Sequence, residues 1–236
     1  MTPDPTGRSP RGFFVTGTDT GVGKTLVSCA LLRALAARGM RVIGMKPVAA
    51  GATDVNGVLI NDDVEQLIAA GNVSAPRELI NPYCFAAAIA PHIAATEEKK
   101  LVDINALLSS FQQLTLRAER VIVEGAGGFC VPLNDTASSA DLARALALPV
   151  VLVVGMRLGC LNHALLTAEA IRARGLVLAG WIANHIDAHM PRMHANVAAL
   201  QARLDAPLLA RVAYAPAPDS GEVAARIAVA ALLAAR

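Results

Sequence analysis

Apolar residues recur along the chain with two alternating periods. Short and nearly continuous apolar runs predict buried strands at residues 13–15, 41–46, 120–124, 149–155, 176–184 and 207–212. Apolar residues at every third or fourth position predict helices at residues 24–38, 62–70, 103–117, 138–148, 162–174, 193–204 and 222–236. Since strands alternate with helices, we expect an α/β fold with a doubly wound, mostly parallel sheet and helices on both faces.

Turn and cap residues set the limits of these elements. Asn61 is placed to cap the helix at 62–70, and Ser138 or Ser139 to cap the helix at 138–148. Residues 51–57 are expected to form a loop, and residues 72–100 have a mixed pattern. Residues 1–11 contain three prolines and few apolar positions, so we expect a flexible N-terminal tail followed by a single domain over residues 12–236.

Residues 12–25 read G-F-F-V-T-G-T-D-T-G-V-G-K-T and combine a short strand, a glycine-rich turn and the start of a helix. Glycine lets backbone N–H groups approach phosphate oxygens, and the helix start adds free donors and a positive dipole end. In such a loop Lys24 would contact the β- and γ-phosphates, and the Thr25 hydroxyl would bind Mg²⁺. The segment predicts a P-loop NTPase fold, although Thr18 stands where the strict motif has glycine.

Ligands of open α/β sheets bind beyond the carboxyl ends of the strands, so polar residues there are site candidates. Lys46 follows a buried strand and would neutralise an anion, unless it is simply solvated. Glu124 follows V-I-V in the Walker-B arrangement, where a carboxylate binds Mg²⁺. Asp62 and Asp63 begin a helix, where a carboxylate either binds the metal or only favours the helix dipole.

Three further segments lie beyond predicted strands. The glycines at 125, 127 and 128 would let the backbone pass close to phosphates. The turn over residues 155–163 has free N–H groups that suit a carboxylate, or it is an ordinary connection. Asn184 carries donor and acceptor in one plane, which suits an adenine edge or a cap. Asp19, within the glycine loop, shapes an Asx turn or faces Mg²⁺-bound water or a cationic ligand, since a carboxylate beside phosphates is otherwise costly.

Composition excludes several classes of protein. The net charge is +2 with no long basic run, and only 3% of residues are aromatic, so we expect no nucleic-acid binding. The four cysteines form no C-x-x-C motif, and the histidines have no metal-ligand spacing. The N-terminus lacks a secretory apolar region, and the apolar stretch at 145–156 is too short to span a membrane. We therefore expect a cytoplasmic enzyme that is not bound to a membrane.

Seven segments together resemble one family. They are F-V-T-G-T-D-T-G-V-G-K-T, K-P-V-A-A-G, N-P-Y-C-F, A-P-H-I, V-E-G-A-G-G, L-P-V-V-L-V-V-G-M-R-L-G-C-L-N-H-A and L-A-G-W-I-A-N, in this order from residue 13 to about residue 184. The chain resembles the dethiobiotin synthetases, ATP-dependent carboxylases of biotin biosynthesis. The resemblance implies that 7,8-diaminononanoate, CO₂ and ATP give dethiobiotin, ADP and phosphate through a carbamate and a carbamic-phosphoric anhydride.

The resemblance also implies roles for individual residues. Lys24 and Lys46 would be catalytic, stabilising the carbamate and the transferring phosphate. Thr25, Asp63 and Glu124 would hold Mg²⁺. The nucleotide would contact Gly21, Val22, Gly23, Lys24, Thr25, Leu26, Asp63, Glu124, Gly125, Ala126, Gly127, Asn184 and His185. The substrate would contact Thr18, Lys46, Ala50, Gly159, Cys160, Leu161 and Asn162, with the last four contributed by the second subunit of a homodimer.

Two positions depart from the family pattern. The family often has serine where this chain has Ala50, so a substrate hydrogen bond is missing or is supplied by Thr16, Thr18 or water. Residues 213–219 read A-Y-A-P-A-P-D and lack the usual P-W-L piece near adenine. The chain therefore predicts phosphate binding more directly than it predicts the nucleotide base.

Other functions fit the same glycine loop. A cobyrinate-type amidotransferase would require a glutaminase domain with a suitable cysteine, which this sequence does not contain. A P-loop switch ATPase of the partitioning or metallochaperone type has a lysine where this chain has Asp19, together with a membrane helix or metal-binding tract. An inert nucleotide-binding fold is the third alternative.

Overall fold

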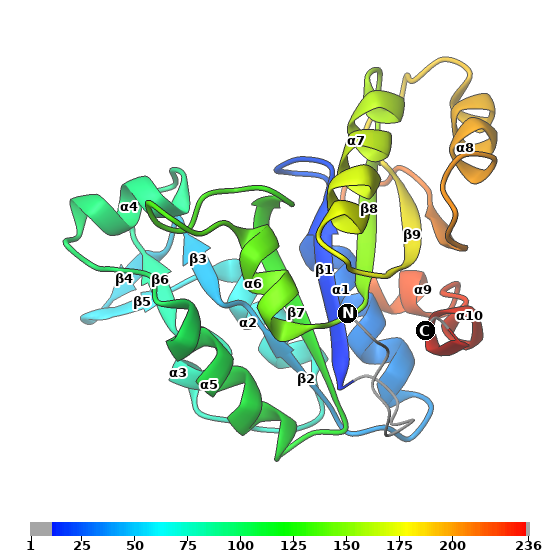
Figure 1. Ribbon diagram of the computed structural model, residues 1–236. Coiled ribbons are helices and arrows are strands. Elements are labelled where there is room, and N and C mark those ends of the chain that lie inside the picture. Colours follow the sequence, from blue (N-terminus) through cyan, green and yellow to red (C-terminus); the bar gives the residue numbers. More distant parts are fainter. Residues whose placement is uncertain (1–10, 235–236) are drawn as a thin grey trace.

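The computed structural model describes residues 11–234 and is built on one central sheet (Figure 1). Its strands lie in the order β10-β9-β8-β1-β7-β2, and every neighbouring pair is parallel. Their bounds are β1 Gly12–Gly17, β2 Val42–Met45, β7 Arg120–Gly128, β8 Val150–Met156, β9 Leu178–His185 and β10 Leu208–Val212. All six lie where apolar runs predicted strands. Of the predicted tail at residues 1–11, residues 1–10 lie outside the described residues.

The helices predicted from the 3.6-residue period cover both faces of this sheet, as expected for a doubly wound fold. Those that match a prediction are α1 Lys24–Ala36, α2 Asp62–Ala70, α5 Ile104–Thr115, α6 Ser139–Leu146, α7 Cys160–Ala173 and α8 Met193–Gln201. Short helices occur at α3 Arg77–Ile80, α4 Pro91–Glu97, α9 Ser220–Ala224 and α10 Val229–Ala234. The predicted fold class is confirmed.

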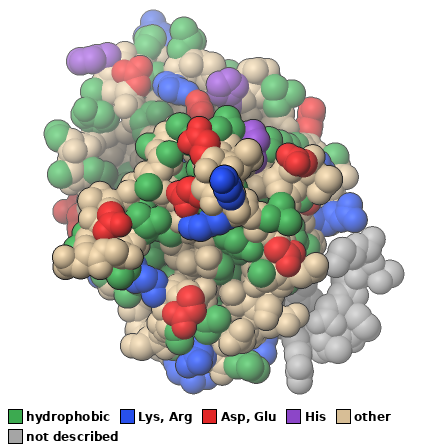
Figure 2. All heavy atoms as spheres, turned by 90° about the vertical axis from the view of Figure 1, so that its left-hand side faces the viewer, with side chains coloured by type: hydrophobic (Ala, Val, Ile, Leu, Met, Phe, Trp, Pro, Cys, Tyr) green, Lys and Arg blue, Asp and Glu red, His purple; other side chains and the backbone are tan. Residues whose placement is uncertain are grey.

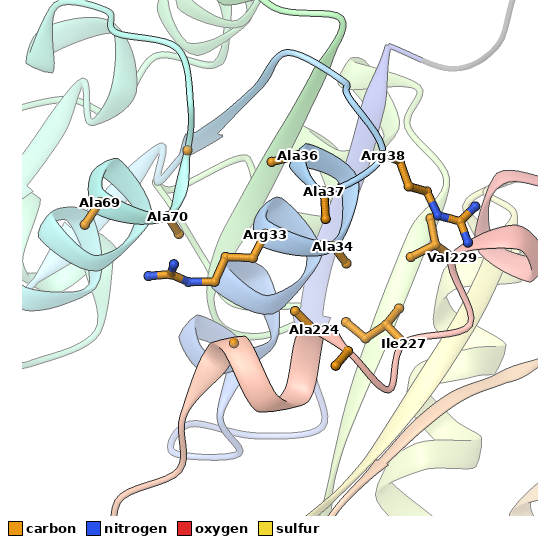
Figure 3. Close-up of a pocket in the computed structure, with 13 residues that line it drawn as sticks. Arg33, Ala34, Ala36, Ala37, Arg38, Ala69, Ala70, Ala224, Ile227 and Val229 are labelled. Carbon is orange, nitrogen blue, oxygen red and sulfur yellow. The ribbon is translucent and has the colours of Figure 1, made fainter.

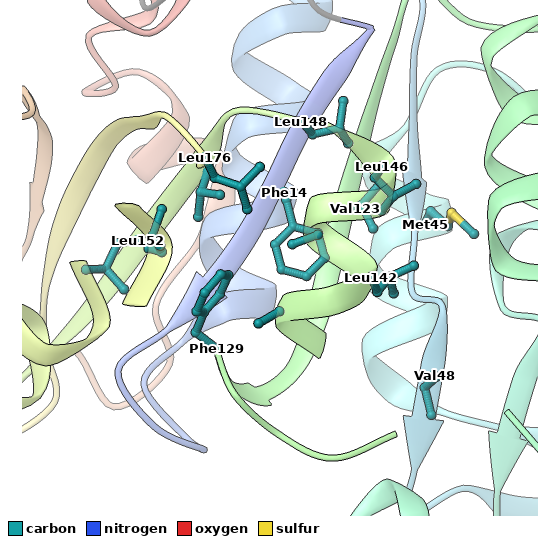
Figure 4. Close-up of a cluster of buried hydrophobic side chains, with 14 of the residues drawn as sticks. Phe14, Met45, Val48, Val123, Phe129, Leu142, Leu146, Leu148, Leu152 and Leu176 are labelled. Atoms are coloured by element: carbon teal, nitrogen blue, oxygen red, sulfur yellow. The ribbon is translucent and has the colours of Figure 1, made fainter. Parts of the chain in front are cut away.

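Successive side chains of β1 point to opposite faces of the sheet, and each face has its own core. Phe13 and Val15 belong to a core that includes residues of α1, α2, α9 and α10, whereas Phe14 belongs to a core that includes residues of α5, α6, α7 and α8. Around Phe14, side chains of β2, β7 and α6 point toward one another (Figure 4). Because β1 is buried on both faces, the phosphate loop that follows it starts from a fixed position.

Four predicted boundaries were wrong, each for a local reason. The final helix, predicted at 222–236, is divided into α9 and α10 within the described residues, because Ala228 N donates to Leu209 O (2.9 Å) and the buried Ile227 packs in the core; residues 235–236 of the prediction lie outside the described residues. The strand predicted at 120–124 continues to Gly128, which pairs with Gly17. The helix predicted from residue 162 begins at Cys160, since Gly159 turns the chain with φ +95°.

The fourth boundary concerns residues 51–57, which are not only a loop. Strands β4 (Thr53–Val55) and β5 (Val58–Ile60) form an antiparallel hairpin there. Asn56 and Gly57 connect them, both with positive φ (55° and 83°). Asn-Gly is a strong hairpin signal because both residues tolerate this conformation. In the mixed region, β6 (Tyr83–Phe85) pairs in parallel with β3 (Val48–Ala50).

The face on the left of Figure 1 carries charges of both signs. Figure 2 shows basic and acidic side chains interspersed with apolar ones over this face. Such a mixed surface agrees with the small net charge of +2. The absence of a nucleic-acid partner stays a prediction.

The parallel register brings the ends of distant strands to one edge of the sheet. Val15 of β1 pairs with Glu124 of β7, and Thr16 pairs with Leu152 of β8. Lys46 directly follows β2, which pairs with β7 on its other side. The glycine loop, Lys46, Glu124 and the turn after β8 therefore lie at the same edge.

Candidate active site

The glycine loop between β1 and α1 leaves no room for side chains at two positions. A Cβ on Gly17 would lie 2.6 Å from Val22 Cγ2, and one on Gly23 would lie 2.2 Å from Asn184 Nδ2. Gly21 and Gly23 also have positive φ (73° and 87°). Among the described residues no side chain caps α1, which begins at Lys24. The first N–H groups of this helix are therefore available to an anion.

Thr18, the residue that departs from the strict motif, joins the loop to β8. Its backbone N donates to Val153 O (3.0 Å), and its hydroxyl oxygen accepts from Gly155 N (3.2 Å). Val22 packs against the same glycine, because a Cβ on Gly155 would lie 2.6 Å from Val22 Cγ1. The phosphate loop is thus held in place by β8, and Thr18 has a structural role at this position.

A lysine and two carboxylates meet in the buried space between β2, α2 and β7. Lys46 Nζ donates to Glu124 Oε1 at 2.5 Å and to Asp63 Oδ2 at 2.8 Å. Thr25 Oγ1, at the start of α1, donates to the same Glu124 oxygen at 2.9 Å. Glu124 is fully buried, and the Lys46 side chain is 6% exposed. The structure therefore brings together four of the residues that the sequence singled out.

Burial and charge act in opposite directions on these groups. Burial by itself lowers the pKa of Lys46, but the facing carboxylates of Glu124 and Asp63 raise it above its ordinary value. For Asp63 burial acts to raise the pKa, and the Lys46 ammonium outweighs it and lowers the pKa. Both groups are accordingly ionised at neutral pH. Lys24 differs, because burial and then the neighbouring Lys46 charge lower its pKa.

Asn81, which the sequence analysis did not single out, fixes the backbone that carries Lys46. Its side-chain amide donates to Lys46 O at 2.7 Å and to Tyr83 O at 2.9 Å. Lys46 N in turn donates to Ile80 O at 2.8 Å. The segment N-P-Y-C-F, which begins at Asn81 and includes β6, thus holds the backbone of Lys46 in place. Its only signal in the sequence was an amide next to proline in a region without clear periodicity.

The residues around Glu124 suit a hard divalent cation that prefers oxygen ligands. Glu124 Oε2 is buried and has no hydrogen-bond partner among the described residues. The Thr25 hydroxyl donates to Glu124 Oε1 and also lies within hydrogen-bond reach of the Asp63 carboxylate. Lys46 joins the same two carboxylates. Across residues 11–234, no three His, Cys, Asp or Glu side chains gather to hold a metal. Two carboxylates and a hydroxyl fit Mg²⁺, which is usually completed by phosphate and water oxygens.

The glycines that follow Glu124 run beside the phosphate loop. Gly125, Ala126 and Gly127 lie within β7. A Cβ on Gly127 would lie 3.5 Å from Thr20 Oγ1, and Gly127 has φ +62°. This part of β7 therefore forms one wall of the loop.

A small pocket lies beyond the loop, between the ends of β9 and β10. Its volume is about 280 Å³, and it is lined by Gly21, Gly23, Leu26, Asn184, His185, Ile186, Ala213, Tyr214, Ala215, Pro216 and Pro218. Its size and its place beside the phosphate loop suit a nucleotide base. Tyr214 and the prolines belong to residues 213–219, the segment that the family resemblance placed near adenine, although none of them was named as a site residue.

Asn184 and His185 both line this pocket but make different contacts. Asn184 Nδ2 donates to Val22 O at 2.8 Å, so part of its amide holds the phosphate loop. His185 Nε2 is buried without a hydrogen-bond partner in the described part of the chain. Burial, followed by the nearby His194 and Arg211 charges, lowers the pKa of His185. A neutral imidazole therefore lies beside the pocket at pH 7.

The turn after β8 begins α7. Gly159 is the N-cap with φ +95°, and no described side chain caps this helix. Cys160 is buried, which raises its thiol pKa, whereas Asn162 is exposed and Leu161 half-buried. Because β1 and β7 lie between β8 and β2, the turn lies about three strand spacings, roughly 14 Å, from Lys46 at the end of β2. The structure does not bring these four residues into contact with Lys46.

Ala50 ends β3, and its carbonyl accepts from Asn61 Nδ2 at 3.2 Å. Asn61 in turn caps α2, which carries Asp63, by accepting from Val64 N at 3.4 Å. Ala50 therefore lies beside the start of the helix that supplies Asp63. Its methyl group offers no hydrogen bond to a substrate.

A larger hollow lies at the opposite end of α1 and is distinct from this site. It measures about 650 Å³ and is lined mainly by alanine and glycine, with Arg33 and Arg38 from α1 and the residues after it (Figure 3). None of the described residues that line it carries a carboxylate. The groups capable of phosphate and metal chemistry are at the other end of the helix.

No helix within residues 11–234 is both long and apolar enough to cross a lipid bilayer.

Comparisons with known proteins agree with this geometry. A protein-family model described as "AAA domain" matches residues 11–220. The chain is 53% identical over 218 residues to the "ATP-dependent dethiobiotin synthetase BioD" of Aromatoleum aromaticum, covering 92% of this chain and 97% of that protein. It is 54% identical over 220 residues to the protein of the same name from Nitrosospira multiformis, covering 93% and 96%.

Solved structures with similar folds are more distant. The MinC:MinD cell division protein complex of Aquifex aeolicus matches with TM-score 0.52 at 15% identity, over 87% of this chain and 82% of the matched chain. A ParA family ATPase from Chlorobium tepidum TLS matches with TM-score 0.51 at 12% identity, over 88% and 85%. At such low identity these matches describe the fold alone.

Proposed function

Because the chain belongs to the family of ATP-dependent dethiobiotin synthetases, we propose that its buried lysine–carboxylate cluster serves the family reaction. This enzyme is an ATP-dependent ligase of biotin biosynthesis that forms dethiobiotin. Its substrates are 7,8-diaminononanoate, CO₂ and ATP. The observation that carries the assignment of the site is the position of Lys46, between Glu124 and Asp63 and next to Thr25 of the phosphate loop.

The reaction proceeds in three steps with balanced charge. One amine of the diamine adds to CO₂ and loses a proton, which leaves a carbamate anion. A carbamate oxygen then attacks the γ-phosphorus of ATP, and ADP leaves. The second amine attacks the carbonyl carbon of the resulting anhydride, phosphate leaves, the attacking nitrogen loses a proton, and the ureido ring closes.

Each step forms or brings together anionic groups, so the enzyme must position the reactants and neutralise their charge. Lys24 and Lys46 are the buried cations of this site, and we assign them the transferring phosphate and the carbamate. The helix α1 adds its uncapped N–H groups at the phosphates. A fixed ammonium stabilises developing anionic charge more strongly in a water-poor site than in water.

We assign Mg²⁺ to Thr25, Asp63 and Glu124. Bound there, the ion would neutralise phosphate charge and so assist phosphoryl transfer. The unpartnered Glu124 Oε2 supports this assignment. Lys46 neutralises the same carboxylates in the structure, so binding of a divalent cation would loosen its hold on them and leave its ammonium to face the carbamate.

We assign the base of ATP to the pocket beside Asn184 and His185, with Leu26 on its wall. We further propose that the substrate carboxylate binds at Gly159, Cys160, Leu161 and Asn162 in the second subunit of a homodimer. The distance of this turn from Lys46 within one chain supports a contribution from a second copy. Thr18 and Ala50 would line the path of the substrate.

We propose that the enzyme works in the cytoplasm. All four cysteines are free: Cys29, Cys84, Cys130 and Cys160. Free thiols are usual in a reducing compartment, where ATP is also available.

The switch-ATPase alternative has one specific argument against it. Asp19 stands where those proteins have a lysine that reaches a partner subunit, and its carboxylate pairs with Arg157 of the same chain. The likeness to MinD and ParA proteins is one of fold.

The proposed function is tested with purified protein. With Mg-ATP, bicarbonate and 7,8-diaminononanoate, we expect dethiobiotin and ADP in equal amounts, measured by mass spectrometry and a coupled ADP assay. Omission of the diamine should abolish ADP release. Undiminished ATP turnover without the diamine would contradict the synthetase function.

A further inference from the structure

An ion pair joins the phosphate loop to the segment that follows β8. Arg157 Nη2 donates to Asp19 Oδ2, across 138 positions of sequence. The two side chains are 45% and 43% exposed, so both face the open edge of the sheet. An ion pair this exposed contributes little to folding. Its position suggests a different role.

Asp19 is connected to the phosphate loop and the start of α1 through two further atoms. Its second carboxylate oxygen, Oδ1, accepts from Thr20 N at 2.7 Å. Its backbone carbonyl accepts from Lys24 Nζ at 3.1 Å. Any displacement of Asp19 therefore moves both the tip of the loop and the acceptor of the phosphate-binding lysine.

The carboxylate of Asp19 is unfavourable for a loop that binds polyphosphate. Like charges repel, and the repulsion grows when a ligand excludes water from between them. Arg157 supplies the opposite charge from outside the loop. The base of the loop is already held to β8 by the neutral contacts of Thr18 with Val153 and Gly155, so the guanidinium acts at the tip.

We propose that Arg157 is a positioning residue for nucleotide binding: its guanidinium neutralises Asp19 and holds the phosphate loop in the form that accepts a triphosphate. The inference rests on the proposed function only through nucleotide binding. Arg157 does not touch the reacting atoms, and its effect passes through Asp19. Arg157 lies in the short segment between β8 and α7, and from there it raises the affinity for the nucleotide.

A double-mutant cycle read by nucleotide affinity tests this role. The Kd of Mg-ADP is measured by titration calorimetry in about 50 mM salt, where exposed charges are weakly screened. We expect Arg157→Ala to weaken binding about tenfold, within the usual range of coupling between sites. Arg157→Lys keeps the charge and should stay within about threefold of the parent, since lysine lacks only the planar fork.

Removal of the repelling carboxylate should restore binding. The double variant Asp19→Asn, Arg157→Ala should recover most of the lost affinity, because asparagine keeps the acceptor for Thr20 N without the charge. The loss in Arg157→Ala should also shrink in about 0.5 M salt, where the screening length falls below 5 Å. A purely structural role for Arg157 would give neither the recovery nor the salt dependence.

Arg174 provides a matched control. It forms a comparable exposed ion pair with Asp141 at 2.5 Å, away from the phosphate loop. Arg174→Ala should leave the Kd of Mg-ADP unchanged. An unchanged Kd in Arg157→Ala, or no recovery in the double variant, would overturn the proposal. Because calorimetry needs no turnover, failure to form dethiobiotin would count against the proposed function and not against this role of Arg157.

Discussion

Lys46 Nζ lies 2.5 Å from Glu124 Oε1 in a space where Glu124 is fully buried. The two residues come from β7 and from the end of β2, which are neighbours in the sheet. A buried pair of this kind adds little net stability, but removal of one partner leaves the other charge uncompensated. This relationship makes Lys46 both a catalytic candidate and a structural requirement, and experiments must separate the two.

Lys46→Ala should lower turnover by at least about a hundredfold, the scale of losing one contact to developing negative charge. The variant should also unfold at a lower temperature, because Glu124 and Asp63 lose their counter-ion. Mg²⁺ at millimolar concentration should recover part of the melting temperature but little of the turnover. Near-normal turnover would remove Lys46 from the catalytic residues.

Glu124→Gln should weaken divalent-cation binding by at least about tenfold, as expected for loss of a carboxylate at a metal site. Binding of Mn²⁺ in place of Mg²⁺ is measured by electron paramagnetic resonance in the presence of ADP. Glu119→Gln is the control, since Glu119 is half exposed and pairs with Arg41 at the other end of β7. Equal Mn²⁺ affinity in both variants would speak against the assigned metal site.

Gly23→Ala should abolish nucleotide binding. The added Cβ would lie 2.2 Å from Asn184 Nδ2, and the residue has φ +87°. Gly39→Ala is a control for the backbone term alone, because Gly39 has φ +79° and nothing within 4 Å of the added Cβ. A left-handed conformation costs an L-residue roughly 1–2 kcal/mol in either variant. Calorimetry with Mg-ADP should show binding in Gly39→Ala, and retained binding in Gly23→Ala would show that the loop tolerates the contact.

Acidification should destabilise the protein partly through His185. Burial, then His194 and Arg211, lower its pKa below the ordinary 6.5, so the unfolded chain binds a proton more readily than the folded protein. Stability from this group is therefore complete above pH 6.5 and declines as the pH falls toward the lower folded-state pKa. The free energy of unfolding in urea should fall less between pH 7 and pH 5.5 in His185→Asn than in the parent. An identical decline in both proteins would exclude His185 as a source of this dependence.

Much of the fold was predictable because apolar periodicity reports local structure. The runs ending at Lys46 and in Glu124 gave the strands of the site, and Asn61 capped α2 as predicted. The errors fell where local preference competes with packing. The helix predicted at 222–236 is broken by burial of Ile227 and by the bond from Ala228 to β10, neither of which has a local signal.

The sequence by itself determined the phosphate loop, the alternation of strands and helices, and which residue types stand at the carboxyl ends of the strands. Each of these depends on neighbours a few positions apart. Only the tertiary structure decided that Lys46 neutralises both Glu124 and Asp63. It also decided that Asn184 donates to the Val22 carbonyl and that Arg157 forms an ion pair with Asp19. These partners are between 17 and 162 positions apart. Strand order and register set such contacts. The hydrophobic pattern along the chain would be the same for any order of the strands, so it cannot predict which distant residues meet.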